Sequence, residues 1–146
     1  MKVYLDACCL NRPFDDQSQD RIRLESEAII IILNLLYKGE WKWIGSEALE
    51  IEIENNPNIE KRNYLKRIAY FVHKTIKIQN KESIRAKQLE EVGFKSFDAM
   101  HIACAESEKA DVFLTTDDKL LKLAKRNKNK LNIDIANPVL WLMQRL

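Results

Sequence analysis

The sequence predicts an α/β fold: a three-layer α/β/α sandwich with a mainly parallel central sheet, formed by residues 1–146 as one domain. Short apolar runs with strand-forming residues alternate along the chain with longer segments whose apolar residues recur at helical spacing. The length of 146 residues suits one hydrophobic core. With only 3 glycines and 3 prolines, regular structure should dominate and loops should be short.

The first half of the chain alternates two strand signals with three helical ones. The run KVYL ends at Asp6, and WKWI repeats the strand pattern farther on. Between them, an apolar stripe at helical spacing stops at Gly39, a residue type that often follows helix ends. Ser46 is suited to N-cap the next helix, which ends before Pro57. The expected elements are a strand at 2–5, a helix at 20–38, a strand at 41–44, and helices at 47–54 and 58–73.

The second half continues the alternation with the strand-like runs TIKI, DVFLT and NIDI. Gly93 closes one helical segment, Ser96 is a candidate N-cap for the next, and Pro138 suits the first turn of the last. The expected elements are strands at 75–78, 111–115 and 132–135, and helices at 81–92, 97–109, 117–126 and 138–146.

Composition narrows the class of protein without naming a function. The net charge of +2 gives no global argument for nucleic-acid binding, although basic residues are concentrated in 119–130 and 61–67. The 3 cysteines are odd in number and lack metal-ligand spacing, which favours reduced thiols and a cytoplasmic location. We expect no membrane segment and no signal peptide, because the apolar runs are too short for either.

Acidic residues follow, or lie one element beyond, several predicted strands. Asp6 ends the first strand and Asp117 follows the fourth, whereas Glu52 and Asp98 lie on predicted helices. Ligands of parallel sheets bind at the carboxyl ends of strands. Each acid alone has a structural explanation such as helix capping, but unpaired carboxylates beside apolar runs are costly and repel one another. A divalent cation would relieve both effects, and Mg²⁺ and Mn²⁺ prefer carboxylate oxygens.

The stretches YLDACCL, SEALEIEI, SFDAMHIACA and FLTTDDKLL resemble, in this order, the four acidic motifs of the PIN domain family, which includes the VapC toxins of bacterial toxin–antitoxin pairs. The resemblance covers nearly the whole chain and implies a PIN-like fold. It also implies an endoribonuclease that hydrolyses RNA phosphodiester bonds with one or two Mg²⁺ or Mn²⁺ ions, leaving a 5′-phosphate and a 3′-hydroxyl. The implied catalytic and metal-binding acids are Asp6, Glu52, Asp98 and Asp117, with Asp118 as a further acid at or near the metal.

The second acidic motif is the least specific, because several glutamates crowd it. The family spacing favours Glu52, with Glu50 and Glu47 as alternatives. The resemblance also makes Thr115 a hydroxyl that supports the site. Ser46 is a second candidate for such a role, with helix capping as an equal alternative. The candidate contacts with the RNA backbone are Arg12, Lys119 and Lys122, whose alternative role is that of solvated surface charges.

Two other residues near the motifs have reactive side chains. His101 shares a helix face with Asp98, and a packed or hydrogen-bonded role is preferred to a metal-ligand role. Cys8 is a weak candidate nucleophile, because the sequence offers no argument for a histidine partner.

The expected partners are single-stranded or structured RNA, an antitoxin protein and a second copy of the chain. The homodimer is implied by the resemblance and by the apolar segments AIIIILNLLY and VLWLMQRL. One alternative is a catalytically inactive PIN-fold module that binds nucleic acid or protein. An aspartate phosphotransferase or receiver domain fits less well, because Cys8 and Gln79 stand where such proteins carry aspartates.

Overall fold

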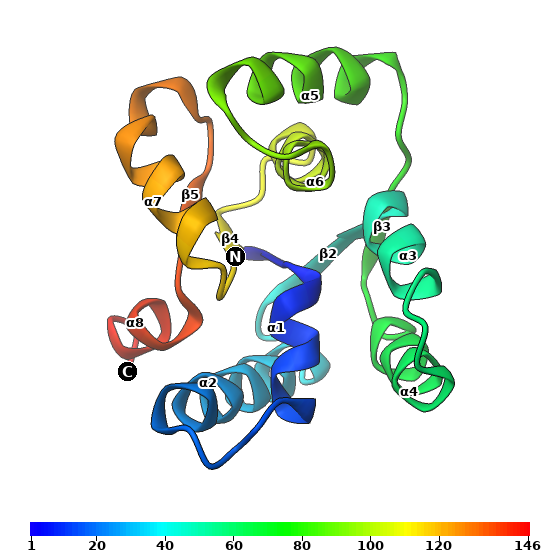
Figure 1. The fold of residues 1–146 in the computed structure, drawn as a ribbon, viewed down its shortest axis with the longest axis vertical. Coiled ribbons are helices and arrows are strands. Elements are labelled where there is room, and N and C mark those ends of the chain that lie inside the picture. The colour runs from blue at the N-terminus through cyan, green and yellow to red at the C-terminus, as the bar shows by residue number, and fades with distance from the viewer.

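A five-stranded sheet lies between two layers of helices in the computed structural model, which describes residues 1–146 (Figure 1). The strands are β1 (Lys2–Leu5), β2 (Lys42–Ser46), β3 (Lys74–Ile76), β4 (Val112–Leu114) and β5 (Asp134–Ala136). Their order is β3-β2-β1-β4-β5, and every neighbouring pair is parallel. The predicted α/β/α sandwich is therefore confirmed, with a sheet that is entirely parallel.

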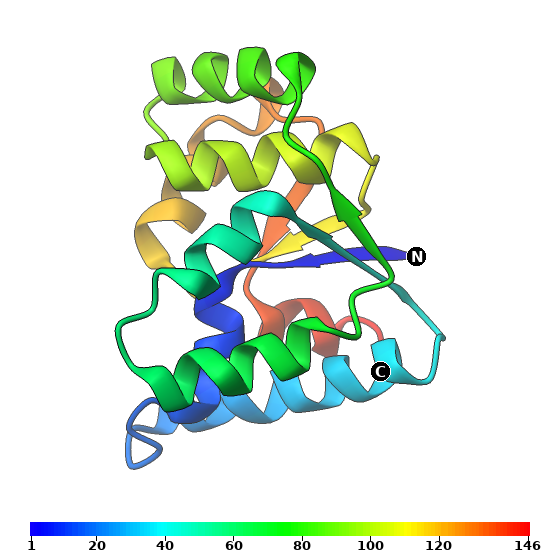
Figure 2. The same cartoon turned by 90° about the vertical axis from the view of Figure 1, so that its right-hand side faces the viewer.

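Helices cover both faces of this sheet (Figure 2). The α-helices are α1 (Ala7–Asn11), α2 (Asp20–Tyr37), α3 (Glu47–Glu54), α4 (Ile59–Ala69), α5 (Asn80–Val92), α6 (Ser96–Ser107), α7 (Asp118–Arg126) and α8 (Pro138–Met143). Two short 3-10 helices, Arg12–Phe14 and Lys128–Lys130, follow α1 and α7. The upper layer in both views contains α5 and α6, whereas α1, α2, α4 and α8 lie below the sheet.

Alternating side chains of the strands supply two separate cores. Val3 and Leu5 of β1 belong to the core shared with α2, whereas Tyr4 belongs to the core shared with α6. Phe113 of β4 stacks on Tyr4 with the ring centroids 5.2 Å apart. Because both faces of the sheet are covered at its centre, the central strands β1 and β4 are almost continuously apolar, as buried parallel strands usually are, whereas the edge strands β3 and β5 are more exposed.

Glycines and capping residues mark several predicted helix ends. Gly39 and Gly93 follow α2 and α5 with φ values of +76° and +125°, which confirms the predicted ends. Ser46 caps α3 as predicted, since its Oγ accepts a hydrogen bond from the Leu49 amide at 3.1 Å. The predicted cap at Ser96 is wrong: Lys95 is the N-cap of α6. The Ser96 hydroxyl instead donates to a carboxylate of the neighbouring helix α5 at 2.6 Å.

Some helices are shorter than the sequence predicts. The segment predicted as a helix at 58–73 is helical only over Ile59–Ala69, and a turn then leads into β3. The final helix covers Pro138–Met143 and stops before the last residues. No helix combines the length and the hydropathy that a membrane crossing requires.

Candidate metal centre

Two of the predicted acids follow neighbouring strands at the carboxyl edge of the sheet. Leu5 of β1 pairs with Leu114 of β4, and the Asp6 amide donates to the Leu114 carbonyl at 3.0 Å. Asp6 is the N-cap of α1, and Asp117 is the N-cap of α7. Both carboxylates thus follow adjacent parallel strands, although the acids are far apart in the sequence.

Asp6 is nearly buried and has several hydrogen-bond donors. Its Oδ1 accepts from the Ala7 amide at 2.8 Å, and its Oδ2 accepts from the Thr115 hydroxyl at 2.9 Å. The thiol of Cys8 lies 3.4 Å from Oδ2 and 3.3 Å from the Thr115 hydroxyl. Burial raises the pKa of Asp6, and the negative charge of Glu52 adds to this, whereas His101 and Thr115 oppose it. The hydroxyl predicted at Thr115 therefore orients Asp6.

Asp98 and Glu52 reach the same region from helices. Asp98 lies in the first turn of α6, where the positive end of the helix dipole faces the carboxylate. Burial, followed by the nearby charges of Asp6 and Asp117, raises the pKa of Asp98 to about 6, and Glu52 adds a smaller effect of the same sign. The carboxylates are thus close enough to repel one another, as predicted for this cluster.

Of the three glutamates considered for the second motif, Glu52 lies in the cluster. One ligand atom each from Asp6, Glu52 and His101 lies within 4.8 Å of the other two. The Glu47 carboxylate instead accepts from the Ile78 amide at 2.6 Å, and Glu50 is exposed on the surface of α3. The helical geometry of α3 therefore points Glu52 toward Asp6, whereas Glu47 is bonded to the backbone after β3 and Glu50 faces solvent.

His101 is completely buried beside the acids, and its two ring nitrogens have partners. Its Nε2 lies 3.2 Å from Oε1 of Glu52, and its Nδ1 is hydrogen-bonded to the Tyr4 hydroxyl. Burial alone would lower the pKa of His101, but the bond to Glu52 and the charges of Asp6 and Asp98 raise it overall. The predicted packed or hydrogen-bonded role is confirmed, with Glu52 and Tyr4 as the partners.

Two residues predicted to serve the site have their charged groups engaged elsewhere. The Asp118 carboxylate forms a bidentate ion pair with Arg21 of α2, with N–O distances of 2.6 and 2.7 Å. The Arg12 guanidinium pairs with the buried Glu25 at 2.8 Å and with Asp15 at 3.0 Å. The metal role of Asp118 and the RNA role of Arg12 stay predictions. Arg21 also donates to the Thr116 carbonyl at 3.3 Å and so holds the loop before α7.

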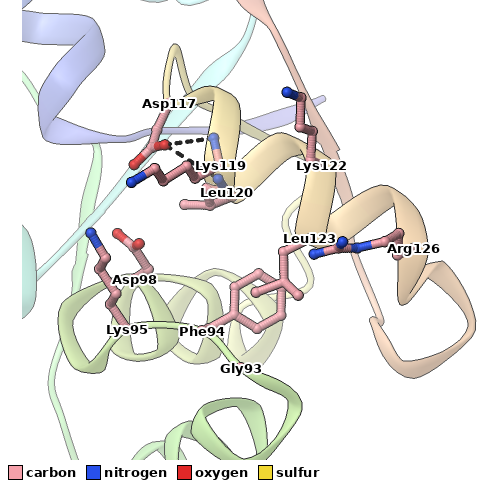
Figure 3. A pocket seen from close by; sticks show the side chains of 10 residues that line it. All are labelled: Gly93, Phe94, Lys95, Asp98, Asp117, Lys119, Leu120, Lys122, Leu123 and Arg126. Carbon is pink, nitrogen blue, oxygen red and sulfur yellow. Dashed lines mark hydrogen bonds between the residues drawn. The ribbon is translucent and has the colours of Figure 1, made fainter.

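A pocket of about 360 Å³ opens beside the acids, between the turn before α6 and one face of α7 (Figure 3). The carboxylates of Asp98 and Asp117 lie at the same end of this pocket. Four basic residues share its lining: the predicted Lys119 and Lys122, together with Lys95 and Arg126. Arg126 lies within the basic run noted in the sequence, whereas Lys95 was missed because it stands alone before the third motif.

The donor set fits a hard divalent cation. The centre offers carboxylate oxygens from several elements, and burial together with the neighbouring carboxylates raises the pKa of Asp98 and of Asp6. Mg²⁺ and Mn²⁺ favour oxygen ligands and would reduce the repulsion between these groups. Asp6 and Glu52 belong to the group whose ligand atoms lie within 4.8 Å of one another, together with His101. The metal roles of Asp98 and Asp117, which line the basic pocket, stay predictions.

Comparisons with known proteins agree with this arrangement. The family profile of the PIN domain matches residues 3–126. FitAcB from Neisseria gonorrhoeae has a similar crystal structure, with 15% identity, a TM-score of 0.61, and coverage of 93% of this chain and 97% of that chain. VapBC2 from Rickettsia felis, solved bound to a DNA fragment from its promoter, gives 17% identity, a TM-score of 0.61, and coverage of 94% and 98%. A search of curated proteins finds no match.

Proposed function

The chain belongs to the PIN domain family, and we propose from this premise that it is a Mg²⁺- or Mn²⁺-dependent endoribonuclease whose residues 1–146 act as one nuclease domain. The observation that supports the proposal is the closeness of Asp6 and Glu52 at one edge of the sheet, where burial and the charges of Asp6 and Asp117 raise the pKa of Asp98 to about 6. Carboxylates whose pKa values are raised by burial and by neighbouring charges cluster at functional sites. The proposed ligands are Asp6, Glu52, Asp98 and Asp117.

Each part of the site has a separate task in phosphodiester hydrolysis. A divalent cation, when bound, supplies activation of water and stabilisation of the charge that develops on the phosphate. Asp6 is held by the Ala7 amide and the Thr115 hydroxyl, so its oxygens are fixed before the ion arrives. Asp98 and Asp117 border the pocket, where they face the position proposed for the scissile phosphate.

The pocket beside the acids supports RNA as the substrate. Lys119 and Lys122 lie along its α7 side, and Lys95 and Arg126 complete its basic lining. Such groups neutralise backbone phosphates without reading sequence. We therefore propose that the RNA strand passes through this pocket and places one phosphate against the acids. This geometry suits a single strand or a flexible loop.

We further propose that the enzyme is the toxin of a toxin–antitoxin pair in the cytoplasm. The similarity to VapBC2, whose structure includes promoter DNA, supports an antitoxin as the protein partner. A homodimer is proposed as well, because α2 and α8 expose large apolar side chains, among them Ile30, Ile31, Leu140 and Met143. Light scattering of the purified chain at micromolar concentration tests the dimer, and a monomer mass would refute it.

The nuclease is tested by cleavage of single-stranded RNA with Mn²⁺, with Mg²⁺ and in EDTA. We expect cleavage only with a metal, and loss of cleavage in Glu52→Gln. Glu50→Gln and Glu47→Gln are matched controls on the same helix, and both should retain activity. Activity in EDTA, or full activity in a folded Glu52→Gln variant, would contradict the proposed site. RNA binding without any cleavage would instead favour an inactive binding module.

A further inference from the structure

We propose that Ser46, Tyr4 and His101 form a directional hydrogen-bond relay that orients Glu52 for metal binding, so that Tyr4 and His101 are positioning residues of the site. The relay starts at the Leu49 amide, whose N–H donates to the Ser46 hydroxyl at 3.1 Å. Ser46 lies 2.6 Å from the Tyr4 hydroxyl, which is bonded to Nδ1 of His101. This inference rests on the proposed metal-dependent function.

The hydrogen bonds of the relay lie in the protein interior, so the loss of any one of them leaves a buried polar group without a partner. Tyr4 and His101 are fully buried, and Ser46 has an exposed fraction of 1%. A buried hydroxyl or ring nitrogen without a partner is strongly unfavourable, because no water replaces the missing bond. The Tyr4 ring is also fixed by stacking on Phe113, with an interplanar angle of 9°. The hydroxyl of Tyr4 therefore stays between Ser46 and His101.

The donors and acceptors of the relay run in one direction. The relay is proposed for the neutral ring of His101. An ionised Glu52 can only accept, so Nε2 of that ring carries the proton and donates to it. Nδ1 then accepts from the Tyr4 hydroxyl, and Tyr4 accepts from Ser46. Ser46 already accepts from the Leu49 amide, so its own proton is free to point at Tyr4. This order satisfies every polar group, whereas in the reverse order the lone pair of an unprotonated Nε2 would face the carboxylate of Glu52, which can only accept.

The same order argues against His101 as a metal ligand. Its Nε2 carries a proton directed at Glu52, and the lone pair of Nδ1 is occupied by Tyr4. No lone pair of the ring remains for a cation. His101 instead fixes one oxygen of Glu52, which leaves the other oxygen of that carboxylate free for the ion. A hydrogen bond from outside the ligand shell often orients a ligand in this way.

The position of the relay connects three of the acidic motifs. Tyr4 lies two residues before Asp6 on β1, and His101 lies three residues after Asp98 on α6. Ser46 caps α3, the helix that carries Glu52. The relay therefore ties the three elements that bring these acids together, and it ends on the one acid that lies farthest along its helix from the sheet edge.

The first test is Mn²⁺ affinity, measured by calorimetry or by electron paramagnetic resonance on the folded protein well below its melting temperature. We expect Tyr4→Phe and His101→Leu to weaken binding by about 10- to 100-fold, the range for partners that orient metal ligands. His101→Gln, which keeps an N–H near the position of Nε2, should recover part of the loss. Tyr70→Phe, which removes an exposed hydroxyl, is the control and should bind normally.

The outcomes separate the relay from the proposed function. If Glu52→Gln leaves Mn²⁺ affinity unchanged, both the site and the relay are refuted. If Glu52→Gln weakens affinity but Tyr4→Phe and His101→Leu do not, the relay alone is refuted. A fall in melting temperature in these two variants with normal Mn²⁺ affinity in the folded fraction would likewise assign them a purely structural role.

Two spectroscopic measurements test the direction of the relay. A long-range ¹H–¹⁵N spectrum of the Mg²⁺-loaded protein should show the proton of His101 on Nε2, and a proton on Nδ1 would contradict the proposed order. Spin-echo modulation of the Mn²⁺ complex should show no directly coordinated nitrogen. A coordinated nitrogen that disappears in His101→Leu would make His101 a ligand and overturn the proposal.

Discussion

At the amino edge of the sheet, Glu108 lies between two lysines, whereas at the carboxyl edge Asp6 and Asp98 lie among other carboxylates. Glu108 is 2.9 Å from Lys74 and 3.4 Å from Lys2, and the bond to Lys74 lowers its pKa. Burial and neighbouring charges instead raise the pKa of Asp98 to about 6. The carboxylate at the amino edge is thus paired with lysines of the chain, whereas the carboxyl edge brings several carboxylates close together, and there we propose the metal site.

The largest expected effect is a loss of RNA cleavage when a carboxylate is removed at the carboxyl edge but not at the amino edge. Asp98→Asn should lower Mn²⁺-dependent RNA cleavage by about 1,000-fold or more, because stabilisation by a catalytic metal is worth several kcal/mol. Asn keeps the shape of the side chain but removes the charge that the cation requires. Glu108→Gln, at the other edge, should keep normal activity. The measurement is a cleavage rate on single-stranded RNA; full activity in a folded Asp98→Asn variant would refute the role of the acids.

A second effect concerns stability with metal. Mn²⁺ at about 100 times its Kd should stabilise the protein by about 2.7 kcal/mol, or roughly 5–10 °C in melting temperature. Asp98→Asn should lose most of this shift, while its stability in EDTA should be unchanged or slightly higher, since one repelling charge is gone. Glu108→Gln should keep the whole shift. Thermal melts with Mn²⁺ and with EDTA measure the shift and the metal-free stability. An equal Mn²⁺ shift in the wild type, Asp98→Asn and Glu108→Gln would contradict a role for Asp98 in metal binding.

The lysines of the two edges should differ in RNA binding. Lys119→Ala and Lys122→Ala should each weaken binding and lower the slope of log affinity against log salt by about 0.7, the value for one contact with a single strand. Lys74→Ala should leave both quantities unchanged, because that lysine is paired with Glu108. Titrations at several salt concentrations, with Asp98→Asn as a non-cleaving background, provide the measurement. A similar slope change in Lys74→Ala would show that the pocket has no special role.

The smallest expected effect is the pH dependence of stability in EDTA. The folded pKa of Asp98 is raised, so its contribution to stability is complete below the unfolded value and is lost as pH rises through about 6. Acidification from about pH 7.5 to about pH 5 should therefore stabilise the wild type more than Asp98→Asn. Glu108 behaves oppositely: its pKa is lowered, and its contribution is lost only as pH falls through that lowered value.

Melts of Glu108→Gln supply the control for this pH effect. Between about pH 7.5 and about pH 5 that variant should respond to pH as the wild type does, because Glu108 is ionised throughout that range. The loss of its surface ion pairs should lower stability by at most about 1 kcal/mol. An identical pH response in Asp98→Asn and the wild type would remove the evidence for strain at the carboxyl edge.

The local pattern of the sequence was enough to predict the α/β fold and most of its elements. The helix ends at Gly39 and Gly93 and the cap at Ser46 depend on neighbouring backbone groups, so the residue types alone indicated them. The cap predicted at Ser96 failed because its hydroxyl bonds to a carboxylate on another helix. The sequence around Ser96 does not show that a carboxylate of another helix lies within hydrogen-bond distance of its hydroxyl.

The sequence by itself determined which acids lie near strand ends, and the tertiary structure decided which of them meet. Neighbouring parallel strands β1 and β4 bring Thr115 to Asp6, across 109 positions of the chain. The position of Glu52 on α3 places its carboxylate near Asp6, and the carboxylate of Asp118 forms an ion pair with Arg21. The relay through His101 likewise depends on three packed elements. Periodicity and capping act over a few residues, whereas strand order and side-chain pairing arise from packing across the whole chain, which a local pattern does not encode.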